Sequence, residues 1–248
     1  MSLDLTPLAA WFAASLVVLI AMQRWMTGSL QRLLARLLGS PRRALMVYAF
    51  LLLPGVTLHE LSHWLSARLL GVRATSISLL PRLTRDGNLR LGYVQTEAVD
   101  PVRASLIGAA PLVAGTAVLW LLGPRVLSWD VLGRAAVQGR GGELLDGLHA
   151  VTQVPVWGLW LYLAVVVSNT MLPSRADRAA WGWVAVAAIL TGGSLLLFGW
   201  GDAAANLAQA PVRAILTYLA AAFTLTAVLD TLVGLPLWML EVAFRRRG

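Results

Sequence analysis

Two histidines stand four residues apart, with a glutamate directly after the first, in the run LHELSH at residues 58–63. On a helix, residues four apart point from the same face, so both imidazoles can bind one zinc ion. Glu60 lies beside them and can take a proton from a zinc-activated water and then return it as a peptide bond is hydrolysed. The spacing therefore predicts a zinc site with His59 and His63 as ligands and Glu60 as the catalytic acid and base.

A bare His-Glu-x-x-His pattern also occurs by chance in soluble helices, but this chain is strongly apolar. Of its 248 residues, 58% are hydrophobic and only 13% are charged, with a mean hydropathy of +0.72. Soluble domains have about 25% charged residues, so we expect an integral membrane protein with a single membrane domain. Ionisable residues inside a membrane span are costly and usually functional, which argues against a chance match.

The charge and the cysteine content exclude other classes. The net charge of +8 comes from arginines scattered between apolar runs, whereas nucleic-acid binding needs them gathered on one polar face. The absence of cysteine excludes disulfides and a thiolate metal site.

The long apolar runs predict an all-α polytopic membrane protein with about six transmembrane helices. The helix that carries the motif also contains Pro54 and Gly55, which predict a kink. A short amphipathic helix is expected at residues 30–38, after the first span. It would lie at the level of the lipid headgroups or, alternatively, form a solvated linker. The six spans are expected at about residues 8–22, 44–70, 102–122, 156–172, 179–200 and 214–244.

A β-hairpin is expected directly after the motif helix, within residues 72–98. Two partly alternating runs flank the pair Asp86-Gly87, which is a typical hairpin turn. The arginines of the loops on the two sides nearly balance, and the count tips slightly towards a hairpin and termini on the cytoplasmic side.

A catalytic zinc needs a third protein ligand, and the sequence offers several. His149 is the one remaining histidine, but it lies in a mixed loop near Asp146, where a surface role is expected. Asp177 directly follows the fourth expected span. Asp230 lies within the sixth apolar run, so its burial makes it a competitor.

The chain resembles the site-2 protease family of intramembrane zinc metalloproteases over residues 44–181. In that family the His-Glu-x-x-His helix is followed by a small residue and a Gly-Val pair; here Ala67 and the pair at 71–72 follow. A second family signature is an Asn-x-x-Pro stretch with an Asp eight residues after the Asn, which matches Asn169 and Asp177. The run APL at 110–112, with Gly115, is a loose counterpart of a Gly-Pro-containing helix between the two motifs.

The chain departs from the family pattern at two places. Pro173 stands four residues after the Asn instead of three, and Arg178 replaces the glycine that usually follows the Asp. These departures concern the shape of the loop and leave the ligand in place.

The resemblance implies that Asp177 is the third zinc ligand and that Asn169 binds the substrate backbone or the developing oxyanion, although capping of the helix end is an equal alternative for Asn169. It also implies that the hairpin pairs with an unwound substrate through residues 76–80 or 91–96. Ser76, Ser78 and Tyr93 are therefore candidate substrate-binding residues, with a purely structural hairpin as the alternative.

The expected organisation is an extra N-terminal helix with the amphipathic segment at 1–43, a protease core at 44–181, and two C-terminal spans with an arginine tail at 182–248. The expected function is zinc-dependent hydrolysis of a membrane protein substrate, one with a single span, in a bacterial cytoplasmic membrane with the site towards the cytoplasm. The partners are this substrate and the lipid bilayer, with no nucleic acid. Two rival functions are an inactive membrane scaffold of the same fold and a transporter.

Overall fold

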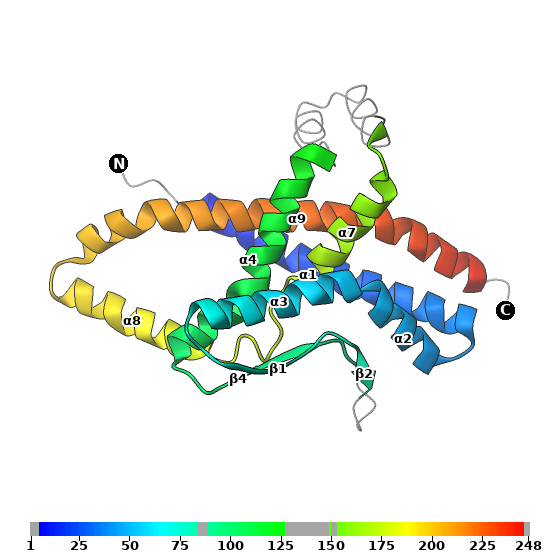
Figure 1. The fold of residues 1–248 in the computed structure, drawn as a ribbon. Helices are drawn as coiled ribbons and strands as arrows, with labels where there is room; N and C mark the ends of the chain where they lie inside the picture. The colour runs from blue at the N-terminus through cyan, green and yellow to red at the C-terminus, as the bar shows by residue number, and fades with distance from the viewer. Residues whose placement is uncertain (1–4, 84–88, 127–148, 150–152, 246–248) are drawn as a thin grey trace.

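The computed structural model describes residues 5–83, 89–126, 149 and 153–245. These residues form a mostly helical protein with a small antiparallel hairpin (Figure 1). The seven helices of 11 or more residues are α1 (Thr6–Leu38), α2 (Pro41–Leu51), α3 (Leu53–Leu69), α4 (Pro101–Val126), α7 (Trp157–Thr170), α8 (Trp181–Leu197) and α9 (Gly201–Arg245).

Three of these helices, α1, α4 and α9, are long and apolar enough to cross a membrane, and a fourth span results if α2 and α3 count as one bent span. The helices α7 and α8 are apolar but shorter, at 14 and 17 residues. This pattern is compatible with an integral membrane protein, while the expected count of six spans is not confirmed.

Two helices are longer than the apolar pattern indicated. The segment 30–38, expected to be a separate amphipathic helix, forms the last turns of α1, which runs unbroken over 33 residues. Similarly, α9 begins at Gly201 instead of near residue 214 and includes Pro211 and Pro236 within its 45 residues. Composition marks where a chain is apolar, whereas helix length depends on backbone hydrogen bonds that continue into polar turns.

The kink expected at Pro54 is confirmed as a bend of 61° between α2 and α3. Proline has no backbone N–H and its ring clashes with the carbonyl four residues earlier, so α2 ends and α3 starts again with Pro54 in its first turn. At the other end of α3, Gly71 adopts a φ of +71° and the Val72 N–H donates to the Ala67 carbonyl. This turn ends the motif helix and directs the chain into the hairpin.

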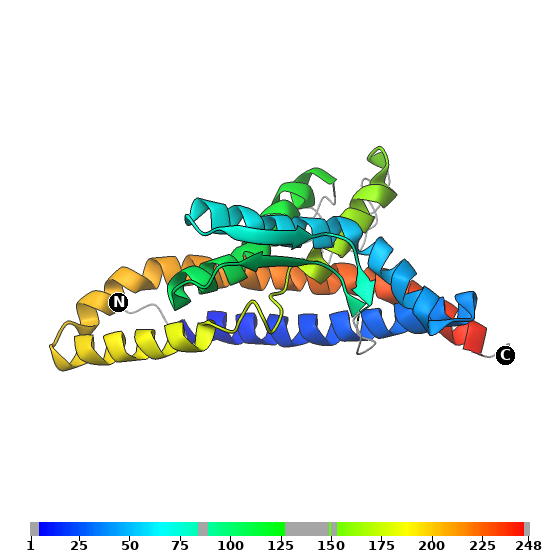
Figure 2. The ribbon, with the colours of Figure 1, turned by 60° about the horizontal axis from the view of Figure 1, so that its bottom comes forward.

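The hairpin is confirmed as two antiparallel strand pairs that continue one another. The first pair joins β1 (Ala74–Ser78) to β4 (Tyr93–Thr96), and the second pair, nearer the turn, joins β2 (Arg82–Leu83) to β3 (Leu89–Arg90). The turn expected at Asp86-Gly87 lies outside the described residues. Figure 2 shows the hairpin running alongside α3.

The first and the last helix run side by side and in the same direction (Figures 1 and 2). Near the start of α1, the ring of Phe12 packs against the tilted ring of Phe223, and near its end Arg32 contacts Glu241. The contact near the end of α1 involves four residues, which we call the α1–α9 clamp: Ser29, Arg32, Arg36 and Glu241. Arg32 donates from Nε and Nη2 to the two carboxylate oxygens of Glu241 at 2.7 and 3.2 Å.

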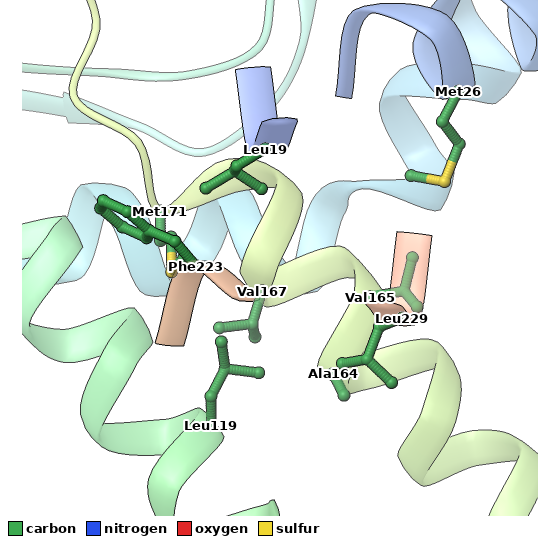
Figure 3. Close-up of a cluster of buried hydrophobic side chains, with 9 residues drawn as sticks. All are labelled: Leu19, Met26, Leu119, Ala164, Val165, Val167, Met171, Phe223 and Leu229. Carbon is green, nitrogen blue, oxygen red and sulfur yellow. The ribbon is translucent and has the colours of Figure 1, made fainter. Parts of the chain in front are cut away.

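The main hydrophobic cluster joins four helices, α1, α4, α7 and α9. Figure 3 shows Leu119 of α4 pointing towards Val167 of α7. Because lipid is as apolar as these side chains, close packing of small residues matters more here than removal from water. Gly55 on α3 meets Val166 and Thr170 of α7, and Gly115 on α4 meets Met171, so α3 and α4 both hold the end of α7.

Candidate metal centre

The structure brings together the three residues that the sequence predicts as zinc ligands. His59 and His63 point from one face of α3, and Asp177 comes from the loop between α7 and α8. The two Nε2 atoms are 3.1 Å apart, and the Asp177 oxygens lie 3.6 Å from Nε2 of His59 and 3.2 Å from Nε2 of His63. Among the described residues these three form a group whose ligand atoms all lie within 4.8 Å of one another.

Each histidine ring is oriented by a backbone carbonyl on its other nitrogen. The Nδ1 atom of His59 donates to the Thr170 carbonyl at 2.6 Å, and Nδ1 of His63 donates to the Ile107 carbonyl at 2.8 Å. A carbonyl can only accept, so each Nδ1 carries the hydrogen, which leaves each Nε2 facing Asp177 to bind a proton or a metal ion. Such outer hydrogen bonds are typical of metal-binding histidines.

Asp177 is held by a tight loop. Its Oδ2 accepts from the Ser174 N–H at 2.7 Å, and the Asp177 N–H donates to Oγ of Ser174 at 3.3 Å. Burial by itself raises the pKa of Asp177, but hydrogen bonds with the two histidines and with Ser174 outweigh it and hold the pKa of this carboxyl well below its ordinary value. The side chain therefore presents a fixed negative charge to the two imidazoles.

Glu60 is buried next to the ligands, with 7% of its surface exposed. It lies against the hairpin at Gly92, where a Cβ atom would sit 2.8 Å from Cγ and 2.9 Å from Oε1 of Glu60. Only glycine fits at this position without moving the carboxylate.

Gly108 on α4 allows the backbone of Asp177 to approach closely, as Gly92 does for Glu60. A Cβ atom at Gly108 would overlap the backbone carbonyl of Asp177. Since α4 also supplies the Ile107 carbonyl to His63, one turn of α4 positions two of the three ligands.

A cavity of about 680 Å³ opens over the three ligands and Glu60. Its walls come from α3, the hairpin residues 90–94, α4 and the end of α7, and they include Tyr93 and Asn169. Ser76 and Ser78 lie on β1, paired with Gln95 and Tyr93, and do not line this cavity. Of the two hairpin segments considered for pairing with substrate, the cavity therefore adjoins residues 91–96.

Asn169 uses both of its amide hydrogens within the protein. Its Nδ2 donates to the Val165 carbonyl at 2.8 Å and to Oδ1 of Asp230 at 2.6 Å. This arrangement leaves no amide hydrogen of Asn169 for an oxyanion, and its carbonyl oxygen is buried without a partner among the described residues.

The other candidate ligands lie elsewhere. Asp230 contacts Asn169 and does not belong to the group of three. His149 is exposed and contacts Gln153.

Sequence reasoning missed the positioning groups Thr170, Ile107 and Gly92. Two of these act through backbone carbonyls, which every residue has, so no side-chain pattern marks them. Gly92 carries a weak signal, because a glycine within a strand often marks a close approach of backbone.

The donor set fits a metal ion of the zinc type. Two imidazoles and one carboxylate beside a cavity could hold a metal ion, and zinc accepts this set of donors. A soft thiolate site is excluded because the chain has no cysteine.

The chain was also compared with known proteins. No family model, no curated protein and no solved structure matches it.

Proposed function

We propose that this protein is an intramembrane zinc metalloprotease of the site-2 protease type. It would hydrolyse a peptide bond in or near a transmembrane segment of a membrane protein. The observation that supports this most directly is the convergence of His59, His63 and Asp177, with Glu60 buried beside them in a chain that carries apolar helices of membrane-spanning length.

The side chains divide the chemistry between them. A bound zinc ion would supply Lewis acidity, polarising the scissile carbonyl and lowering the pKa of a water to about 7. Glu60 would accept a proton from the attacking water and return it to the leaving amine. The two Nδ1 hydrogen bonds keep both Nε2 atoms directed at Asp177, and these three residues would hold the metal ion.

The hairpin supports a role in holding the substrate. A helix must be unwound before cleavage, because its backbone is otherwise hydrogen-bonded to itself, and pairing with a strand replaces those bonds. Residues 91–94 and Thr96 line the cavity, so the segment 91–96 is the proposed partner of the extended substrate.

The rest of the proposal concerns the membrane. We propose about six spans, with α7 and α8 counted among them, in a bacterial cytoplasmic membrane, and the metal centre towards the cytoplasmic side. The proposed substrate is a membrane protein with a single span.

The proposal is tested by replacing Glu60 with glutamine. Wild type and Glu60→Gln are expressed at equal levels, purified for zinc analysis, and compared for single-span proteins that accumulate uncut in the membrane. We expect about one zinc per chain in both. Cleavage should be at least roughly 100-fold slower in the variant, as is typical for loss of an acid–base group.

Glu241→Gln is the matched control, because it makes the same change at a buried glutamate of the α1–α9 clamp. It should cleave like wild type. Purified wild type without zinc, together with identical membrane proteomes for wild type and Glu60→Gln, would overturn the proposal.

A further inference from the structure

Asp230 is a completely buried carboxylate in α9 that the proposed chemistry does not use. Its Oδ1 accepts a hydrogen bond of 2.6 Å from Asn169, and its Oδ2 has no partner among the described residues. No described arginine or histidine forms an ion pair with it. Burying such a group is costly, so leucine would serve better at this position if packing were its only purpose.

The orientation of the Asn169 amide follows from its two partners. The Val165 carbonyl can only accept, so the amide nitrogen must lie on its side, and the same nitrogen reaches Asp230. The amide oxygen is then turned away from both and has no partner among the described residues. The Val165 carbonyl and Asp230 together therefore engage the nitrogen end of the amide.

A short path leads from this pair to the metal ligands. Asn169 lies directly before Thr170, whose carbonyl accepts the 2.6 Å hydrogen bond from His59. Asn169 also lines the cavity over the metal centre. The carboxylate on α9 therefore holds the last turn of α7, and that turn holds the ring of His59.

We propose that Asp230 is a positioning residue of the metal centre, acting through the Asn169 amide and the end of α7. The inference rests on the proposed metal site. It assigns a function to the last helix, which lies outside the segment with the two motifs.

Zinc affinity tests this inference independently of any protease activity. Purified Asp230→Leu, Asn169→Leu and the double variant are titrated with zinc against a chromophoric chelator, and their Co²⁺ absorption spectra are recorded. We expect Asp230→Leu to weaken binding about three- to tenfold, less than the roughly 10- to 100-fold typical when a direct partner of a ligand is lost. The double variant should lose no more than Asn169→Leu alone, because both changes break the same path.

Asp230→Asn is the rescue variant. It keeps an acceptor oxygen of the same shape, so its affinity should stay within about twofold of wild type. Glu241→Gln, at another buried carboxylate of α9, should not change the affinity. If Asp230→Leu does not fold, Asp230→Ala replaces it; if neither folds, Asn169→Leu must lose affinity and Asp230→Asn must keep it.

Three results would overturn the inference: unchanged affinity in Asp230→Leu or Asp230→Ala, additive losses in the double variant, or an equal loss in Asp230→Asn. Each of these is read in a protein that binds zinc. A wild type that binds no zinc would instead overturn the proposed metal site, so the two failures are distinguishable.

Discussion

The metal centre and the α1–α9 clamp both place ionisable side chains in mostly apolar surroundings, but their charges are arranged differently. In the clamp, Glu241 is only 3% exposed, and Arg32 grips both of its oxygens while Arg36 lies 4.0 Å away. The Glu241 carboxylate therefore has its counter-charge within the protein. Such a bidentate pair fixes one helix against another and has no free valence for a ligand.

The metal centre has three converging ligand atoms and no arginine among them. His59 and His63 already spend one nitrogen each on a backbone carbonyl, and their remaining nitrogens face Asp177. The two polar clusters therefore differ in kind. In the clamp an arginine already engages both carboxylate oxygens, whereas the acceptor atoms of His59, His63 and Asp177 lie together beside a cavity, where a cation can bind.

Replacing His63 should have the largest effect. His63→Ala removes one of the three proposed protein ligands. The zinc affinity should therefore fall by more than the roughly 100-fold seen at most when a hydrogen-bond partner of a ligand is removed, and the purified protein should contain no zinc. Metal analysis of the purified protein checks this, with Arg32→Met as the clamp counterpart that keeps its zinc. A His63→Ala protein with full zinc content would remove the distinction between the two clusters.

Zinc should stabilise the folded protein through the metal centre alone. At a free zinc concentration 1,000 times the dissociation constant, binding adds about 4 kcal/mol to the stability. In thermal unfolding, a chelator should lower the apparent Tm of wild type and of Arg32→Met by the same several degrees. In His63→Ala, by contrast, the chelator should not change the apparent Tm.

Close packing at Gly108 should matter for the metal. Gly108→Ala places a methyl group against the carbonyl of Asp177, and such overpacking typically costs about 1–3 kcal/mol. If the whole cost falls on the ligand, the zinc affinity should be roughly 5- to 150-fold weaker. Gly182→Ala on α8 is the matched control, because its Cβ meets nothing within 4 Å. Equal affinities in the two variants would show that Asp177 is not held through α4.

Breaking the clamp should have the smallest effect, and it should affect stability only. The Arg32 side chain is 51% exposed, so we expect Arg32→Met to cost about 1 kcal/mol and to lower the apparent Tm by about 2–4 °C. Thermal unfolding and zinc titration of the same sample check this. A weakened zinc affinity in Arg32→Met would mean that the clamp also supports the metal centre.

The sequence predicted much of the architecture because its signals are local. The kink at Pro54 and the hairpin after the motif helix depend on the backbone properties of a few neighbouring residues, and both are confirmed. Helix ends were less predictable, as α1 and α9 show, because helical hydrogen bonds continue beyond the apolar segment. The parallel pairing of α1 and α9 left no local signal, since it joins residues more than 200 positions apart.

For the site, the sequence by itself determined that two histidines and a glutamate lie together, because the four-residue spacing of the histidines on a helix puts them on one face. Asp177 followed only from resemblance, with Asp230 as its rival. The tertiary structure decided between these two carboxylates: the loop after α7 brings Asp177 to the histidines, whereas α9 brings Asp230 to Asn169. It also decided the orientation of both imidazoles and of the Asn169 amide, because backbone carbonyls and a carboxylate from distant segments set these orientations, and no sequence spacing records such contacts.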